Sequence, residues 1–116
     1  MTDHISRIAA LNDRVRFGLD RNARIVMTAT CLATLAGDDR MASEALAQAE
    51  VLAAVRRYVF RSDDGAERAR GEFVVGGTTV RFTIDYYDLS LEWGSEDPAD
   101  AAVTTRVMTI MLPSDD

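Results

Sequence analysis

The chain has 116 residues, of which 47% are hydrophobic and 28% are charged, and its formal net charge is −6. This length and composition predict one folded domain over residues 1–116 and exclude a disordered or fibrous chain. No run of about eighteen apolar residues occurs, and Met1–His4 lacks the basic start and apolar stretch of a signal peptide. We therefore expect a cytoplasmic protein without membrane contact.

The residue types exclude several kinds of chemistry. All thirteen basic residues are arginines, and a chain without lysine has neither a Schiff-base lysine nor a Walker-type phosphate loop. The acidic balance argues against direct binding of nucleic acid. The single cysteine, Cys31, has no disulfide partner or zinc-site spacing and is expected to be buried, and the only histidine, His4, lies at the N-terminus. The sequence therefore predicts no catalytic residue, no metal ligand and no cofactor.

The first predicted elements are a helix over residues 3–19 and a short strand over residues 24–30. The strand is predicted from its β-branched residues. Asn12 falls inside the apolar stripe of the helix, either as a buried amide bonded to the backbone or as a site group exposed in a groove. The stripe itself consists of four apolar residues at helical spacing, Ile5, Ile8, Val15 and Leu19.

A second helix is predicted over residues 40–60, after a break at residues 37–39, with Asp39 as its N-cap. Its small alanines favour close packing on a sheet, and residues 62–71 that follow are predicted to form a surface loop. The face expected to be apolar comprises Ala45, Leu46, Ala49, Leu52, Ala53, Val59 and Phe60.

The clearest local pattern is a β-hairpin in which residues 72–75 and 78–86 flank the two-residue turn Gly76-Gly77. That loop length pairs Phe73 with Val80, and it pairs Glu72 with Arg81. Alternation then places one apolar set on a single face, Phe73, Val75, Val80, Phe82, Ile84 and Tyr86.

Two further elements follow the hairpin. Asp97 and Pro98 indicate the start of a short helix, and residues 103–112 are typical of a strand. The near-continuous apolarity of residues 107–112 predicts a strand covered on both faces. Together the elements predict an α+β domain, an antiparallel sheet of about four strands with two main helices packed on one face.

The whole net charge belongs to residues 83–104, which we call the acidic segment. It holds six acids and no basic residue, whereas the rest of the chain holds thirteen of each sign. Tyr86, Tyr87 and Trp93 are interleaved with those acids. The six acids are Asp85, Asp88, Glu92, Glu96, Asp97 and Asp100.

Three interpretations of the acidic segment remain open. It could be a solvated loop, or a surface for a basic or nucleic-acid-binding protein in which aromatic side chains provide the anchors. It could also be a metal or catalytic carboxylate site at Asp85 and Asp88, with Asp97 or Asp100, although no histidine or calcium-loop spacing is near. For the second interpretation the candidate residues are Asp85, Tyr87, Asp88, Glu92, Trp93, Glu96, Asp97 and Asp100.

Acids spaced two apart along an extended strand would lie about 6–7 Å apart, close enough to stand in for backbone phosphates. A separate alternative is a homodimer with a scaffolding role, joined through the predicted strand at residues 107–112.

Five motifs together resemble a family of small uncharacterised alphaproteobacterial proteins, known only as a domain of unknown function. The likeness covers nearly the whole chain. The motifs are Ile8–Arg14, Ile25–Ala29, Ile84–Asp88, Gly94-Ser95 with Asp97–Asp100, and Thr105–Leu112.

The resemblance implies an accessory role on mobile elements, because similar proteins are carried on conjugative plasmids beside antirestriction genes. With the concentrated charge, it favours a non-enzymatic binding protein, namely an anti-restriction or anti-CRISPR inhibitor that occludes the nucleic-acid-binding site of a defence protein. The alternatives are a metal-dependent enzyme that uses Asp85 and Asp88, and the homodimeric scaffold.

Overall fold

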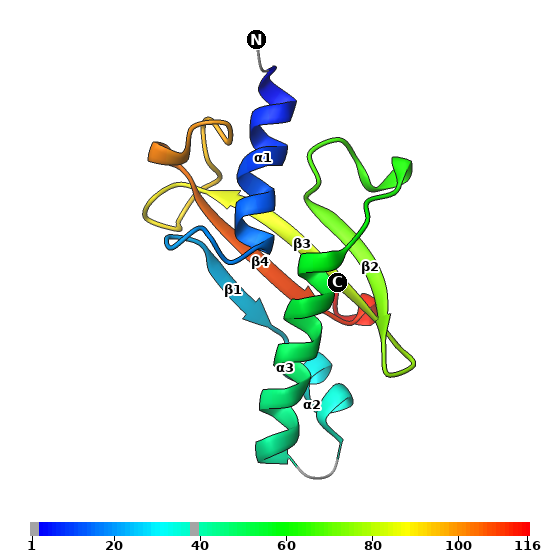
Figure 1. The fold of residues 1–116 in the computed structure, drawn as a ribbon. Helices are drawn as coiled ribbons and strands as arrows, with labels where there is room; N and C mark the ends of the chain where they lie inside the picture. Colours follow the sequence, from blue (N-terminus) through cyan, green and yellow to red (C-terminus); the bar gives the residue numbers. More distant parts are fainter. Residues whose placement is uncertain (1–2, 38–39) are drawn as a thin grey trace.

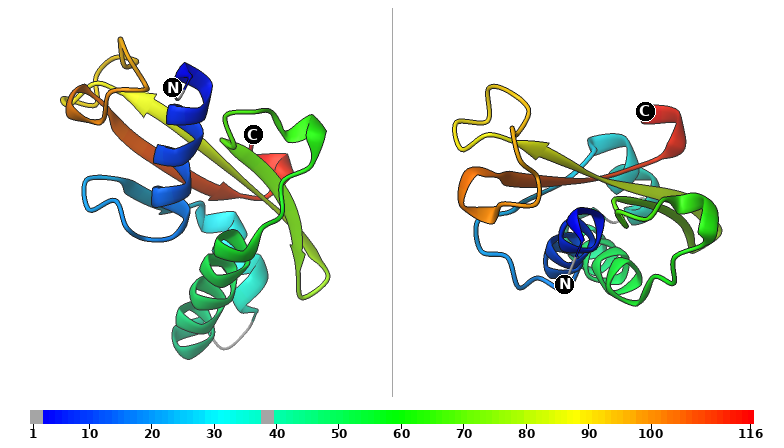
Figure 2. Two further views of the ribbon diagram at one scale, coloured as in Figure 1. Left: turned by 45° about the horizontal axis from the view of Figure 1, so that its top comes forward. Right: turned by 90° about the horizontal axis from the view of Figure 1, so that it is seen from above.

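The computed structural model describes residues 3–37 and 40–116. A four-stranded sheet forms its centre, and two of the helices, α1 and α3, lie on one face of that sheet (Figures 1 and 2). The elements are α1 (His4–Arg16), β1 (Arg24–Met27), α2 (Ala29–Ala36), α3 (Arg40–Arg57), β2 (Arg70–Val75), β3 (Thr78–Tyr87) and β4 (Thr105–Met111). Three single-turn 3₁₀ helices complete them, Ser62–Asp64, Ala101–Val103 and Pro113–Asp115.

The predicted α+β fold with two main helices on one face is confirmed, but the sheet is mixed rather than purely antiparallel. Its strand order is β1-β4-β3-β2, and β1 runs parallel to β4 while the other two pairs are antiparallel. The parallel pair joins strands about 80 residues apart in the sequence, with Arg24 opposite Val107. No turn specifies such a pairing, so the sequence pattern did not reveal it.

The hairpin of β2 and β3 has the predicted register. Phe73 lies opposite Val80, and Glu72 lies opposite Arg81. The Arg81 Nε donates to the Glu72 carboxylate at 2.8 Å. The apolar alternate residues face α1 and α3, and Val80 and Phe82 are fully buried there.

The strand predicted over residues 24–30 is too long. It ends at Met27, because Thr28 takes the extended conformation of an N-cap and its hydroxyl accepts a hydrogen bond from the Cys31 amide at 3.3 Å. Residues 29–36 then form α2, which packs against α3 (Figure 1). A local capping interaction therefore outweighs the β-propensity of this apolar stretch.

Both predicted helices end earlier than expected. The first one stops at Arg16, before Gly18 takes a left-handed φ of 73°. Leu19 therefore lies outside α1 and is 55% exposed. The helix α3 stops at Arg57 rather than at residue 60, and its expected N-cap, Asp39, lies outside the described residues.

The predicted buried face of α3 is only partly correct, since Leu52 does pack against the core. Ala47, Val51 and Val55 are buried, whereas Leu46 is 62% exposed and Ala49 is exposed. The β-branched valines at i and i+4 pack on the sheet, which turns Leu46 toward solvent. Part of α3 also extends past the strand ends, where no sheet covers it (Figure 1).

The core lies between the sheet and the helices. Cys31 is fully buried in it, as expected, and this burial raises the pKa of its thiol. Within the described residues, no helix combines the length and apolarity needed to span a bilayer. The innermost side chains are Val15, Cys31, Val51, Val55, Val80, Phe82, Ile84, Met108 and Ile110.

Near the C-terminus, the helix predicted to start at Asp97 does not form. Asp100 is the N-cap instead, and its carboxylate accepts from the Ala102 amide at 2.9 Å to begin the 3₁₀ turn. The strand β4 then occupies the centre of the sheet. Its helix-facing side chains Met108 and Ile110 are fully buried, whereas Val107 on the other face is only half-buried. The strand is therefore covered unequally on its two faces.

Candidate binding surface

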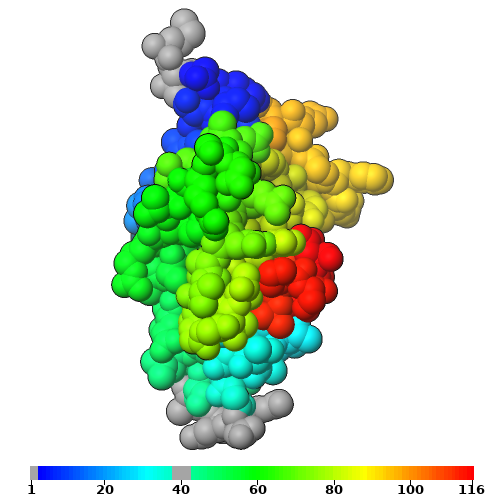
Figure 3. Space-filling model, turned by 90° about the vertical axis from the view of Figure 1, so that its right-hand side faces the viewer, coloured from blue at the N-terminus to red at the C-terminus, as the bar shows by residue number. Residues whose placement is uncertain are grey.

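The acidic segment forms the end of β3 and the loops that connect it to β4. These loops project from one end of the sheet, coloured yellow to orange in Figures 1 and 3. Asp85 lies on β3, on the face away from α1 and α3, and it is exposed. The remaining five acids follow β3 in irregular turns.

The first loop, Asp88–Trp93, is closed by its own hydrogen bonds. The Asp88 amide donates to the Trp93 carbonyl at 2.8 Å, and its carboxylate accepts from the Ser90 hydroxyl and the Glu92 amide. These donors, the Ser90 hydroxyl first, lower the pKa of Asp88. Leu91 takes a left-handed φ of 64°, so the loop holds one strained residue in place.

The second loop is tied to the sheet and to the start of β4. The Ser95 amide donates to the Tyr86 carbonyl at 3.0 Å, and Gly94 forms an isolated bridge with Tyr87. The Thr104 hydroxyl lies 2.6 Å from the Ser95 hydroxyl and donates to the Asp97 carbonyl at 2.9 Å. These contacts give the loops a defined shape.

The ion pairs of the described residues use the carboxylates of Asp13, Glu72 and Asp116. None of the six acids of the acidic segment takes part in them. The carboxylates divide into two groups by their hydrogen bonds. Asp88, Asp97 and Asp100 accept from backbone amides of their own turns. The side chains of Asp85, Glu92 and Glu96 are all exposed and accept no hydrogen bond from the described part of the chain.

Part of the acidic segment surrounds a hollow of about 360 Å³, which we call the Trp93 hollow. Trp93 is 73% exposed, Leu89 is 66% exposed and Val103 is 42% exposed. The acids on its rim are Asp88 and Glu96. Of the predicted site residues, the structure thus brings together Asp88, Trp93 and Glu96; the full lining is Asp88, Leu89, Trp93, Gly94, Glu96 and Val103.

The other predicted site residues do not line this hollow. Asp85 and Tyr87 lie on the open face of β3, and Asp97 and Asp100 belong to the turn that leads into β4. The expected row of acids along an extended strand is also wrong. Only Asp85 lies on a strand, because the chain turns directly after Tyr87.

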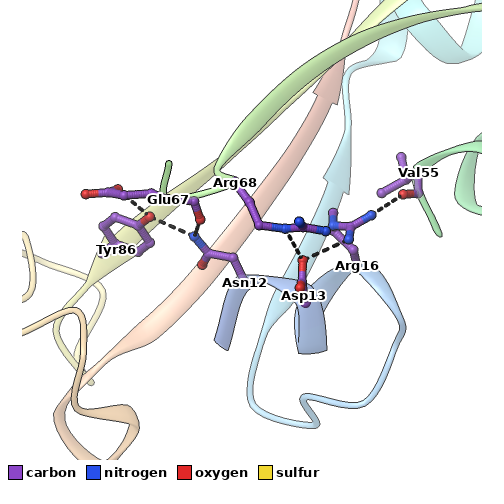
Figure 4. A network of polar contacts seen from close by, with 7 residues as sticks. All are labelled: Asn12, Asp13, Arg16, Val55, Glu67, Arg68 and Tyr86. Atoms are coloured by element: carbon purple, nitrogen blue, oxygen red, sulfur yellow. Dashed lines mark hydrogen bonds and ion pairs between the residues drawn. The ribbon is translucent and has the colours of Figure 1, made fainter. Parts of the chain in front are cut away.

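Beneath the loops lies a buried polar network around Asn12, which is fully buried (Figure 4). Its amide nitrogen donates to the Glu67 carbonyl at 3.0 Å and to the Tyr86 hydroxyl at 2.8 Å. Its amide oxygen accepts from Arg106 Nε at 2.8 Å. Of the two interpretations of Asn12, the buried amide bonded in part to the backbone is therefore the correct one.

Arg106 connects this network to the acidic segment. It is 2% exposed, and one of its terminal nitrogens donates to the Pro98 carbonyl. Its guanidinium carbon lies 5.0 Å from the centre of the Tyr86 ring. Burial lowers the pKa of Arg106. The buried cation thus fixes the second loop from below.

Tyr86 completes the network, and burial raises its pKa to about 12. Its hydroxyl donates to the Glu67 carboxylate at 2.8 Å, which also favours the neutral phenol, while the Asn12 amide opposes this shift. No sequence pattern indicated a role for Glu67 or Arg106. The only available signal was the polar Asn12 inside an apolar stripe, and it did not identify its partners.

A second polar group adjoins the first on α1 (Figure 4). The Asp13 carboxylate accepts from Arg16 at 2.8 Å and from Arg68 at 2.9 Å. Arg16 also donates to the Val55 carbonyl of α3 at 2.8 Å. These bonds join α1 to α3 and to the loop before β2, so their role is structural.

The proposed carboxylate site at Asp85 and Asp88 gains no support from the geometry. In the described ranges 3–37 and 40–116, no three His, Cys, Asp or Glu side chains come together in an arrangement that could hold a metal ion.

The profile of one protein family matches residues 28–115, most of the chain. Its description is "Protein of unknown function (DUF3768)". The chain belongs to the DUF3768 family. The matched residues include every strand except the first, and the expectation of an uncharacterised family is confirmed. The motif Ile8–Arg14 lies outside the match. No curated protein and no solved structure matches the chain.

Proposed function

We propose that this DUF3768 protein is a non-enzymatic binding protein that attaches to the basic, nucleic-acid-binding surface of another protein through its acidic segment. The proposed partner is a defence protein of the host cell, a restriction or CRISPR effector. The protein would act as an inhibitor of that partner on behalf of a mobile element.

One observation carries this proposal, namely that five of the six acids are exposed, Asp88 is half-buried, and none of the six is engaged by an arginine of the described residues. Asp88, Asp97 and Asp100 also accept from backbone amides of their own turns. Asp85, Glu92 and Glu96 pair with no arginine of the described residues. Charges left unpaired at one end of the molecule raise the rate of encounter with a basic partner. The exposed Trp93 adds the kind of side chain that anchors interfaces.

The test uses the three acids whose side chains accept no hydrogen bond from the described residues, in the variant Asp85→Asn/Glu92→Gln/Glu96→Gln. Its matched control, Glu44→Gln/Glu50→Gln/Asp63→Asn, changes the net charge by the same amount away from the acidic segment. The protein is expressed in bacteria that carry a restriction complex or a CRISPR effector, and unmodified phage are plated.

We expect the wild type and the control to raise the plating efficiency, and we expect the segment variant to lose most of this effect. Binding of the purified effector should weaken steeply with salt for the wild type and less steeply for the segment variant. Equal plating efficiencies with the segment variant and the control variant would contradict the proposal. A wild type that leaves the plating efficiency unchanged with every effector tested would contradict it as well.

Two rival functions are tested separately. For the metal-dependent enzyme at Asp85 and Asp88, calorimetry with magnesium, manganese and calcium decides, and a lack of heat at millimolar metal rejects it. The homodimer through β4 could use only the open face of that strand, because both of its edges are already paired with β1 and β3. A molecular mass that stays monomeric across a dilution series, measured by light scattering, rejects it.

A further inference from the structure

The Trp93 hollow is lined by two chemically different sets of side chains. Leu89, Trp93 and Val103 are apolar, although each of these side chains is exposed. Asp88 and Glu96 are anionic. Four of the twelve large hydrophobic side chains exposed in the described residues lie in residues 89–103, so exposed apolar side chains are concentrated in this stretch.

The size of the hollow limits what can occupy it. Its volume of about 360 Å³ lies near the lower end of the range for small-molecule pockets. A dinucleotide or a large cofactor would exceed it, whereas one long side chain fits. A small hydrated cation would leave the apolar side chains of the lining without a partner.

The wall residues select among long side chains by charge and shape. The pKa of Asp88 is lowered by its hydrogen bonds, so its carboxylate is ionised at neutral pH, and Glu96 adds a second negative charge beside it. A cation with an apolar stem complements both the anionic and the apolar side chains of the lining. Guanidinium also stacks flat on an indole ring and is less strongly hydrated than ammonium.

We propose that the Trp93 hollow is an anchor site for one arginine side chain of the partner protein. The stem of that arginine packs against Leu89 and Val103, and its guanidinium lies against the Trp93 ring with Glu96 as the counter-ion. This inference rests on the proposed function and adds to it the chemical group that the surface recognises.

Trp93 is the only tryptophan of the chain, so its fluorescence reports directly on the hollow. The full-length protein is titrated at low salt with a short, acetylated and amidated Gly-Arg repeat peptide. The same peptide with lysine keeps the charge, and the same peptide with citrulline keeps the shape without the charge. We expect a saturable change in emission with arginine, a weaker one with lysine and none with citrulline.

The matched variants are Glu96→Gln, on the wall of the hollow, and Glu92→Gln, in the same loop but outside the lining. Both remove one exposed charge, so both reduce long-range attraction equally. We expect Glu96→Gln to raise the Kd of the arginine peptide roughly two- to fivefold above that of Glu92→Gln.

Equal binding of arginine and lysine peptides, together with equal effects of the two variants, would overturn the anchor site. A lack of any response to the arginine peptide would overturn it as well. Neither result decides the proposed function, because the phage-plating comparison of the two triple variants is measured independently. If the segment variant and its control plate equally while the arginine peptide still binds specifically, the inhibitor role is rejected and the anchor site is kept.

Discussion

At the scale of single residues, Asn12 and Arg106 determine how the candidate surface is supported. They lie 94 positions apart, and their hydrogen bond joins α1 to β4 beneath the acidic loops. Asn12 uses both of its donor hydrogens and its acceptor oxygen, so no simple replacement preserves all three bonds. A buried network of this kind stabilises one arrangement only when every member is satisfied.

Replacing Asn12 by leucine should lower the free energy of unfolding by about 2–4 kcal/mol, because the Arg106 guanidinium and the Tyr86 hydroxyl lose buried partners. Urea denaturation measures this. The control is Asn22→Leu at an exposed position, for which we expect a change within about 0.5 kcal/mol. Similar small effects for both variants would show that the network adds little to stability.

The raised pKa of Tyr86 predicts a loss of stability at high pH. Its phenol titrates near pH 10 when unfolded and at about 12 when folded. Between these values the unfolded chain has released a proton that the folded protein still holds, so the free energy of unfolding falls as the pH rises.

We expect Tyr86 to contribute a loss of about 1 kcal/mol between pH 9 and pH 11. The measurement compares urea denaturation of the wild type and of Tyr86→Phe at both pH values. The other phenols and arginines are common to both proteins, so the difference isolates Tyr86. Identical pH dependence in the two proteins would mean that its phenol titrates normally.

At the scale of elements, the junction between β1 and α2 is decided by Thr28. Its hydroxyl caps α2 and also donates to the Asp115 carboxylate at 2.8 Å, which joins the C-terminal 3₁₀ turn to the start of the helix. The Thr30 hydroxyl donates to the same carboxylate at 2.6 Å. One local cap thus changes the expected strand into a helix and ties down the end of the chain.

Thr28→Ala should therefore lower the free energy of unfolding by about 1–2 kcal/mol, whereas Thr28→Ser should change it by less than about 0.5 kcal/mol, because serine keeps the oxygen. Thr34→Ala serves as the control. Its hydroxyl only bonds back to the Thr30 carbonyl on an exposed helix face, and such bonds add little. A cost for Thr28→Ser equal to that of alanine would argue for methyl packing instead of capping.

At the scale of the whole molecule, the charge is divided unevenly. The acidic segment holds the full net charge of −6 at one end of the sheet, while the remaining acids and arginines balance. Asp88, Asp97 and Asp100 are held by backbone amides of their own turns. Asp85, Glu92 and Glu96 take part in no ion pair of the described residues, so we expect their mutual repulsion to lower the stability of the folded state slightly.

The segment variant Asp85→Asn/Glu92→Gln/Glu96→Gln should consequently be at least as stable as the wild type. At low ionic strength we expect a gain of roughly 0.5 kcal/mol, which should vanish in high salt as screening removes the repulsion. Thermal and urea denaturation across a salt series measure it. A clear loss of stability would show that these carboxylates serve the fold and would remove the argument for a binding surface.

The sequence alone determined the α+β class, the hairpin with its register, the burial of Cys31 and the location of the net charge. Each of these depends on residues close together in the chain, since a two-residue turn and strict alternation specify a hairpin without distant contacts. Only the tertiary structure decided the parallel pairing of β1 with β4, the buried face of α3, the partners of Asn12 and the meeting of Trp93 with Val103. Those features join segments that short-range patterns do not relate, and packing selects them only when the whole chain has folded.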